Sequence, residues 1–321
     1  MSINNIDRKR LKVQEFNAKS SKKGLYLLLP QIGKAVSLSN MQLPDISIPS
    51  NPDLMEMMIE YQRGVLGCSG DRRCWFWENG FDEWQPFASP QSNHFLGKMV
   101  LLDGKPLLIG GCDSGDVKCS ILAKVEVYEE GDKQWHYKTA LPQPTRGFAA
   151  IVIDNGTKVI VAGGMVPSGS TNIVRSFQAL SNIWTSLDPL PSLICCQIGS
   201  LVTLPDAREG FLIVGGFADG LISDKAFFMD LTTMSWERLA AFDTTGNNIY
   251  DGDMFYLEGQ LFVIPSYQGG IRIEATRIFS RQMTDSNTQW IAHDMSAKFD
   301  LGKITKISMV VEEYPIDWIS T

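Results

Sequence analysis

The sequence lacks the features that mark membrane and nucleic-acid-binding proteins. Its apolar runs, such as residues 25–30 and 106–109, fall far short of the roughly 18 to 20 residues that a membrane-spanning helix needs. Basic residues are not in excess, because 29 of them face 36 acidic ones and the formal net charge is -7. Binding to a nucleic acid needs a concentrated positive field. We therefore expect neither a membrane span nor a nucleic-acid partner.

Residues that would build a metal or nucleophilic site are also scarce. Three histidines occur, at positions 94, 136 and 293, and no C-x-x-C pair is present among the six cysteines. Zinc knuckles and a Ser or Cys nucleophile with a histidine partner are therefore not indicated. We expect no cofactor, no metal and no catalytic residue. Two acids that meet across a channel would leave no local motif, so a carbohydrate-active or metal-dependent enzyme stays an alternative.

The amino end lacks the pattern of a secretory leader. The first ten residues, MSINNIDRKR, have no apolar segment after their charges, which predicts a cytoplasmic protein. A missing leader would make a secreted or extracellular location the alternative. Residues 1–22 are basic and rich in Asn and Ser, and we expect a flexible arm or one that docks on a partner. Residues 23–321 are expected to form one domain.

The chain does contain an internal repeat. Gly-Gly pairs end apolar runs at positions 110, 163, 215 and 269, so their first glycines are 53, 52 and 54 residues apart. Tryptophans recur at nearly the same period, 49 to 54 residues, at Trp84, Trp135, Trp184, Trp236 and Trp290. The last four follow the glycine pairs at 20 to 24 residues. The two series therefore belong to one repeated unit.

Each unit has the pattern of four short strands, here named a to d. In residues 92–139, two apolar runs joined by the turn Asp103-Gly104 correspond to strands a and b. A segment in which polar and apolar residues alternate corresponds to strand c, and the segment that contains the tryptophan corresponds to strand d. Glycines at the end of strand b allow positive φ and close backbone approach, and the strand d tryptophan can cover the gap to a neighbouring unit. A fifth, irregular unit has Ser69-Gly70 in place of the glycine pair and keeps Trp84.

A unit of about 50 residues with this order of features resembles the kelch repeat. The resemblance implies an all-β propeller in which each unit forms one blade. Residues 23–44 supply strands b to d of a further blade, and residues 303–315 supply its strand a. We therefore expect a six-bladed kelch-type β-propeller whose first blade is closed by a C-terminal strand, which leaves no free sheet edge at the junction.

Four of the cysteines recur at equivalent places in two successive units. Cys68 and Cys112 end strand b, whereas Cys74 and Cys119 begin strand c. Antiparallel neighbours can reach the Cα separation of about 4.4 to 6.8 Å that a disulfide needs, and the layout is similar to that of secreted animal kelch proteins. Disulfides Cys68–Cys74 and Cys112–Cys119 are thus predicted, although a cytosolic location would keep them reduced. The redox state stays open. The adjacent Cys195 and Cys196 are expected to be largely buried thiols.

The candidate site lies on the face where the b–c and d–a loops emerge together. The resemblance implies a partner groove around the central channel on this face, and loops on a rigid scaffold commonly carry binding residues. Arginine, aromatic and amide side chains there suit a polar peptide or an acidic segment. The candidate partner-binding residues are Arg72, Arg73, His94, Asp113, Arg146, Asn172, Phe217, Asp219, Asn248, Tyr267 and Arg272.

These observations favour a non-enzymatic scaffold for protein–protein interaction. The partner's identity and the oligomeric state do not follow from the sequence. A structural component of a larger assembly, held in part by the basic amino-terminal arm, is the main alternative.

Overall fold

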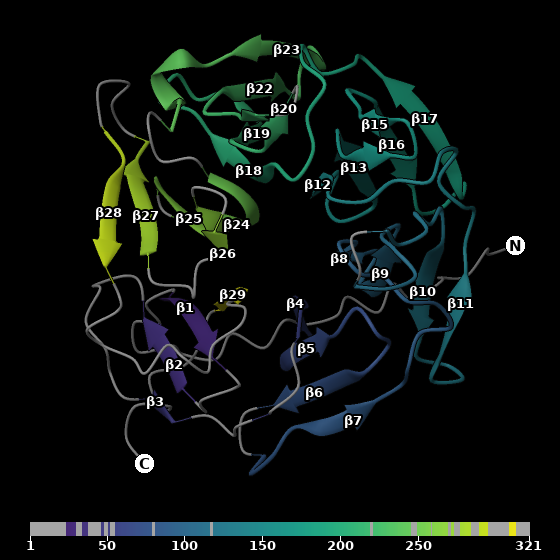
Figure 1. Ribbon diagram of the computed structural model, residues 1–321. Helices are drawn as coiled ribbons and strands as arrows, with labels where there is room; N and C mark the ends of the chain where they lie inside the picture. The colour runs from purple at the N-terminus through teal and green to yellow at the C-terminus, as the bar shows by residue number, and fades with distance from the viewer. Residues whose placement is uncertain are drawn as a thin grey trace, which may run out of the picture.

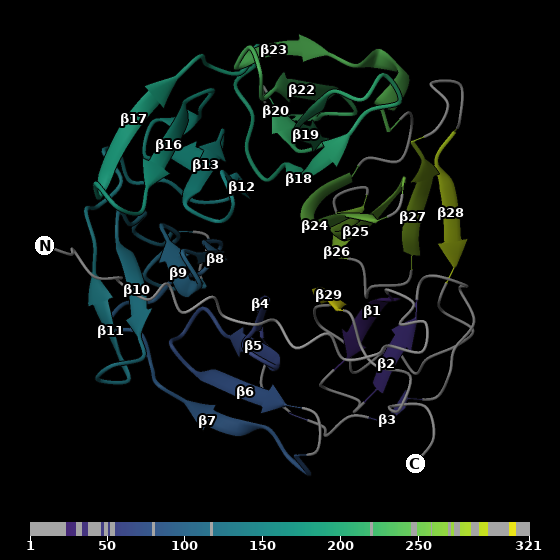
Figure 2. The ribbon, with the colours of Figure 1, turned by 180° about the vertical axis from the view of Figure 1, so that it is seen from behind.

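A computed structural model describes residues 51, 55–78, 81–115, 118–218, 221–244, 249–257, 259–268, 271–272, 277–283 and 289–294, and the backbone of 24–29, 34–37, 46–47 and 308–312. The described elements are β-strands apart from one 3-10 turn, Ala240–Phe242. Their sheets stand like blades around a central axis, so the fold is an all-β propeller (Figure 1; Figure 2 shows the ring from behind). No helix in these residues has the length and apolar character needed to cross a bilayer.

Five blades are each built from one continuous segment, with strands a to d paired antiparallel from the centre outward. Blade 2 contains β4 (Met57–Tyr61), β5 (Gly64–Cys68), β6 (Cys74–Glu78) and β7 (Gln85–Phe87), and blade 3 contains β8 (Lys98–Leu102), β9 (Lys105–Ile109), β10 (Val125–Glu129) and β11 (Gln134–Tyr137). Blade 4 contains β12 (Ala149–Ile153), β13 (Lys158–Ala162), β16 (Val174–Gln178) and β17 (Ile183–Leu187). Blade 5 contains β18 (Ile198–Thr203), β19 (Glu209–Val214), β22 (Ala226–Asp230) and β23 (Ser235–Arg238). Blade 6 contains β24 (Ile249–Leu257), β25 (Gln260–Gln268), β27 (Arg277–Gln282) and β28 (Ile291–Asp294).

A further sheet, blade 1, joins the two ends of the described chain. Its strand order is β29 (Ser308–Glu312), β1 (Gly24–Leu29), β2 (Lys34–Ser37) and β3 (Ile46–Ser47). β29 pairs antiparallel with β1, with Leu25 opposite Val311. The expected all-β propeller is confirmed: five blades are continuous in sequence, and this further sheet pairs a carboxyl-terminal strand with an amino-terminal one. The expected arm at residues 1–22 lies outside the described residues.

The Gly-Gly pairs of blades 3, 4 and 5 connect each of these blades to the next through backbone hydrogen bonds. In blade 4, Gly163 N–H donates to Ile173 O within the blade at 2.9 Å, whereas Gly164 N–H donates to Ile194 O of blade 5 at 2.8 Å. Both glycines have positive φ, 63° and 104°. A Cβ on Gly163 would lie 2.7 Å from Ile194 O, which explains why glycine is needed. The second glycine makes the same bond in two other blades, from Gly111 to Thr145 O and from Gly216 to Ile249 O, both at 2.9 Å.

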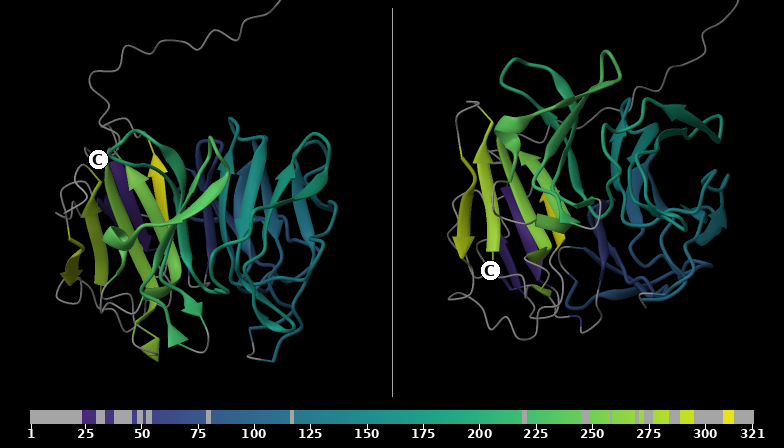
Figure 3. Two further views of the ribbon diagram at one scale, coloured as in Figure 1. Left: turned by 90° about the horizontal axis from the view of Figure 1, so that it is seen from above. Right: turned by 45° about the horizontal axis from the view of Figure 1, so that its top comes forward.

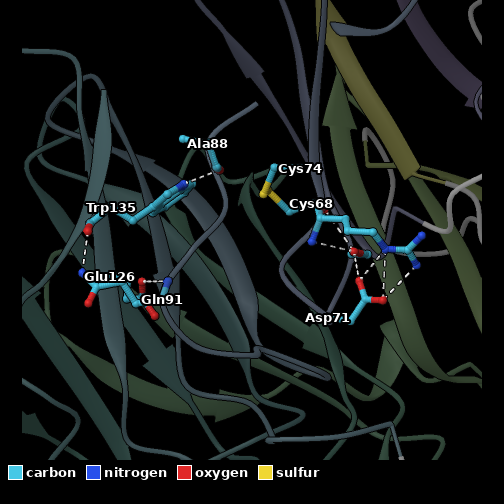
Figure 4. Close-up of a disulfide and its surroundings, with 9 residues drawn as sticks. Cys68, Asp71, Cys74, Ala88, Gln91, Glu126 and Trp135 are labelled. Carbon is cyan, nitrogen blue, oxygen red and sulfur yellow. Dashed lines mark hydrogen bonds and ion pairs between the residues drawn. A yellow bond between two sulfur atoms is a disulfide. The ribbon is translucent and has the colours of Figure 1, made fainter. Parts of the chain in front are cut away.

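The strand d tryptophans form a second connection, between each blade and the one before it. The indole N–H of Trp135 donates to Ala88 O, just after the last strand of blade 2, at 2.8 Å (Figure 4). The same bond recurs from Trp184 to Thr139 O at 2.9 Å and from Trp236 to Asp188 O at 3.0 Å. Each indole thus covers a blade junction and also satisfies its own polar N–H. The expected structural role of these tryptophans agrees with this geometry.

Replacing a junction glycine should destabilise the propeller far more than replacing a glycine in an exposed turn. Gly215 (φ 67°) would place a Cβ 2.1 Å from Ile249 O, whereas Gly156 (φ 86°) would place one with no atom within 4 Å. For Gly156→Ala only the backbone conformation is unfavourable, by about 1 to 2 kcal/mol. For Gly215→Ala we expect a loss of about 4 kcal/mol or more in the free energy of unfolding, measured by urea titration. Equal losses would contradict the close approach between blades 5 and 6.

Candidate functional site

The b–c loops on the predicted partner face are held by two kinds of local structure. In blades 4 and 5 they form short hairpins, β14 (Met165–Val166) with β15 (Gly169–Ser170) and β20 (Phe217–Ala218) with β21 (Leu221–Ile222). In blade 6, β26 (Ile271–Arg272) pairs with the end of β25. In blades 2 and 3 a disulfide closes the loop instead. Figure 3 shows that the strands run between the two faces and that the connections project from them.

Both predicted disulfides are present. Cys68 and Cys74 lie opposite each other in the register of β5 and β6, with Cα atoms 4.1 Å apart (Figure 4). Cys112 and Cys119 close the equivalent loop of blade 3, with a Cα separation of 5.7 Å. The pairing expected from the repeated cysteine positions is therefore confirmed.

The two remaining cysteines are free thiols at the start of blade 5. Cys195 is fully buried and Cys196 is half-buried. A hydrogen bond from the Cys196 thiol stabilises the Cys195 thiolate, which lowers the pKa of Cys195 to about 7 although burial opposes this shift. The same bond, together with burial, raises the pKa of Cys196 well above its ordinary value. The expectation of largely buried thiols agrees with these positions.

A chain of backbone hydrogen bonds links the beginnings of the innermost strands in blades 3 to 6. Gly147 N–H donates to Leu96 O at 2.8 Å, Cys196 N–H to Gly147 O at 2.6 Å, and Asp251 N–H to Cys196 O at 2.6 Å. These four residues begin blades 3, 4, 5 and 6, and all have φ between 50° and 58°. The innermost strands of blades 3 to 6 therefore begin with one shared backbone conformation.

The central channel is lined by the innermost strands. A cavity of about 360 Å³ is bounded by residues of β4, β8, β12, β18 and β24. Lys98 of blade 3 reaches Asp253 of blade 6 across the channel, with 3.9 Å between Nζ and Oδ1. These blades lie on opposite sides of the ring (Figure 1). The polar part of the channel is therefore bridged by an internal ion pair.

Arg146 lies between the b–c loops of blades 3 and 4. Its guanidinium donates to Cys119 Sγ at 2.7 Å, to Cys112 Sγ at 3.2 Å and to Met165 Sδ at 3.2 Å. The side chain is half-buried, and no carboxylate of the described residues pairs with it. Sulfur is a weak acceptor. The arginine is thus positioned by three sulfur atoms, its charge helps to lower the pKa of the nearby Cys195 thiol, and no carboxylate of these residues forms an ion pair with it.

His94 requires a correction, because its side chain is 1% exposed and does not reach the partner face. Its Nδ1 lies 2.7 Å from Gly110 O and its Nε2 lies 3.3 Å from Glu126 Oε1. Glu126 is fully buried and also accepts the backbone N–H groups of Gln91 and Ser92, at 2.6 and 2.7 Å. Burial raises the pKa of Glu126, but these hydrogen bonds outweigh burial and hold the pKa below its ordinary value. His94 and Glu126 therefore form a buried structural pair.

Several other candidates use their polar groups in hydrogen bonds or ion pairs inside the chain. Arg73 pairs with Asp71 at 2.8 Å, and Asn172 Nδ2 donates to Leu190 O at 3.3 Å. Asp113 Oδ1 accepts the N–H of Ser120 at 2.8 Å and so fixes the disulfide-closed loop. Arg72 is exposed and has a positive φ of 74°.

The structure describes three of the remaining five candidates. Phe217 is half-buried at the start of the blade 5 hairpin. Tyr267 and Arg272 lie opposite each other where β25 pairs with β26. Asp219 and Asn248 lie outside the described residues. Among the described residues, no group of three or more His, Cys, Asp or Glu side chains could hold a metal ion.

Comparison with known proteins gives distant relatives and solved structures of the same fold, among them the one described as "Structure of YjhT". No family model matches the chain. It is 25% identical over 198 residues to Kelch-like protein 35 of Mus musculus, which is 60% of this chain and 32% of that protein. It is 28% identical over 116 residues to Beta-scruin of Limulus polyphemus, which is 34% of this chain and 12% of that protein. It is 26% identical over 144 residues to Kelch-like protein 41b of Danio rerio, which is 45% of this chain and 22% of that protein. The matched region thus spans about a third or less of these relatives.

The solved structure, described as "Structure of YjhT", matches with a TM-score of 0.60 at 12% identity. The match covers 81% of this chain and 88% of that one. At this identity the match concerns the fold.

Removal of the buried Glu126 charge should give a pH-dependent loss of stability. We expect Glu126→Gln to reduce the free energy of unfolding by about 3 kcal/mol at pH 7, because it leaves His94 and two N–H groups without a carboxylate. The folded-state pKa of Glu126 lies below the ordinary value of 4.5, so its contribution is complete above that value and is lost as the pH falls through the folded-state pKa. The difference in the free energy of unfolding between Glu126→Gln and the parent protein, measured by urea titration, should therefore become smaller as the pH falls.

The exposed carboxylate of Asp132, which pairs with His136 at 2.7 Å, provides the control. Asp132→Asn should change stability by less than about 1 kcal/mol. A loss for Glu126→Gln that stays constant between pH 7 and acid would show that the charge of Glu126 contributes nothing.

Peptide mapping under non-reducing conditions should show both disulfides directly. Trypsin cuts the chain between Cys68 and Cys74, after Arg72 and Arg73. It also cuts between Cys112 and Cys119, after Lys118. Each disulfide should therefore appear as two linked peptides that separate on reduction. After denaturation with N-ethylmaleimide, only Cys195 and Cys196 should carry the label. Labelled Cys68 or Cys112 would contradict the pairing.

Proposed function

We propose that this chain, a kelch-repeat β-propeller, is a non-enzymatic scaffold that binds an acidic segment of a protein partner on the face formed by the b–c and d–a loops. The proposal starts from a half-buried arginine on this face that forms no ion pair with a carboxylate of the described residues. That residue is Arg146.

The state of Arg146 carries the proposal. Its guanidinium has five N–H donors in a fixed plane, and thioether and disulfide sulfurs use them only weakly. A half-buried cation without a carboxylate partner has an unfavourable environment. An incoming carboxylate would form charge-assisted and potentially bidentate hydrogen bonds, which are about twice as strong as neutral ones. Binding of an acidic side chain would thus use interactions that the free protein lacks.

The surrounding loops support the same proposal. Met165, a contact of Arg146, belongs to the β14–β15 hairpin, and the other two contacts belong to the Cys112–Cys119 disulfide. Both loops are locally closed, so the arginine needs little reorganisation when a partner binds. Less entropy is lost when a binding site is already ordered. Nearby candidates with internal partners, such as Asp113 and Asn172, are assigned to maintaining loop shape.

The test compares partner capture by three variants. Tagged protein and its Arg146→Ala, Arg146→Lys and Arg175→Ala variants are incubated with extract from the native source, and bound proteins are quantified by mass spectrometry. Arg175 is the matched control, because it lies in the same blade and donates to Ser186 Oγ at 2.9 Å. Captured proteins that depend on Arg146 are then purified for direct binding measurements.

We expect Arg146→Ala to weaken binding of such a partner by at least about tenfold and Arg146→Lys by less, since lysine keeps the charge but not the planar fork. Affinity should fall with added salt, and neutralising the partner's acidic segment should reproduce the loss. Circular dichroism confirms that each variant is folded. Equal capture by the parent and Arg146→Ala proteins, or an equal loss in Arg175→Ala, would overturn the proposal.

A further inference from the structure

A second pocket lies at the other end of the sheets, in the junction between blades 2 and 3. This pocket, the seam pocket, has a volume of about 490 Å³. It is lined by the a–b turn residue Gln62, by Glu130 and Lys133 of the β10–β11 turn, and by aromatic rings of Tyr61, Phe87 and Tyr128. The a–b and c–d turns leave the sheet at the end opposite the b–c loops. The seam pocket is therefore separate from the Arg146 face.

Its one acidic side chain is held in a defined orientation. Glu130 Oε1 accepts the hydroxyl of Tyr61 at 2.8 Å and a second hydrogen bond from Gln62 Nε2. Each carboxylate oxygen has about two acceptor sites, so these donors occupy Oε1 and leave Oε2 for a ligand. Glu130 is exposed, and no basic side chain of the described residues forms an ion pair with it. Lys133 lines the same pocket without such a pair.

Aromatic rings beside this carboxylate make the pocket suitable for a cation. Phe87 is half-buried, and its ring centroid lies 4.5 Å from that of Tyr128. Burial raises the pKa of Tyr128, and the negative charges of Glu130 and Asp132 raise it further. Glu130 and Asp132 therefore make the potential at the Tyr128 ring more negative, whereas Lys133 adds a positive charge to the pocket lining. Cations are attracted both to a more negative potential and to aromatic faces.

We propose that the seam pocket binds a lysine side chain of a protein partner. The geometry favours lysine over arginine, because one free carboxylate oxygen matches a single ammonium better than a planar fork that needs two acceptors. The aliphatic stem of lysine can lie along Pro86 and Phe87 while the ammonium reaches Oε2. The site is independent of the function proposed for the opposite face.

The experiment titrates Nα-acetyl-lysine N-methylamide into the intact protein and follows it by saturation-transfer NMR and calorimetry. A probe of this size should bind with a dissociation constant on the order of 1 mM. Two comparison probes test the chemistry. The Nε-acetylated probe has no charge and should bind at least about tenfold more weakly, and the arginine analogue should rank below lysine.

Three variants test the assigned residues. Glu130→Gln keeps an acceptor for Tyr61 but removes the charge, and it should weaken lysine binding about tenfold. Glu129→Gln is the matched control, because the neighbouring Glu129 already pairs with Lys105 at 2.6 Å, and it should bind as the parent does. Tyr61→Phe frees an acceptor site on Oε1, so the arginine probe should gain affinity relative to lysine. Near-ultraviolet circular dichroism reports whether the aromatic cluster is intact.

The proposal is overturned by equal binding of the charged and Nε-acetylated probes, by unchanged binding in Glu130→Gln, or by no binding of lysine up to about 20 mM, well above the expected constant. Loss of binding in Arg146→Ala would also contradict it, because that residue belongs to the other face.

Discussion

A backbone hydrogen bond joins the second glycine of one blade to a carbonyl group at the start of the next blade. This bond determines the geometry of the partner face. Because both its donor and its acceptor belong to the backbone, it fixes the path of the d–a loop that follows. Thr145 accepts this bond from Gly111, and Arg146 is the next residue. The bond therefore brings Arg146 against the disulfide of the preceding blade. In blade 5 the acceptor for Gly164 is Ile194, and Cys195 and Cys196 are the next two residues. They are therefore positioned by this bond as Arg146 is by the equivalent one.

The two ends of the propeller have complementary electrostatic character at their junctions. At one end an arginine is surrounded by sulfur, whereas at the other end a glutamate is oriented by a tyrosine and a glutamine. Other charges pair with each other inside the chain, as with Lys98 and Asp253 across the channel or Lys105 and Glu129 on blade 3. Charged side chains without an internal ionic partner are the ones from which a scaffold can gain binding energy and specificity.

The repeat predicted the blades well because each feature of a blade junction recurs once per unit. Glycine pairs and tryptophans mark backbone bonds whose partners lie in the neighbouring unit, so their period follows directly from the geometry. The disulfides were predictable for the same reason, since Cys68 and Cys112 are equivalent positions. The interactions of individual side chains were not. Nothing in the local sequence distinguishes the buried His94 from an exposed loop histidine, because its partner Glu126 lies 32 residues away on another strand.

Sharing blade 1 between distant segments also has a consequence for biosynthesis. β1 ends at Leu29 and its partner β29 begins at Ser308. At about 5 to 20 residues per second, a ribosome needs roughly 15 to 55 s to make the intervening chain. During that interval the inner edge of β1 has no partner strand, and unpaired strand edges promote association between chains. This edge of β1 is therefore open to association with other chains until the last strand has been synthesised.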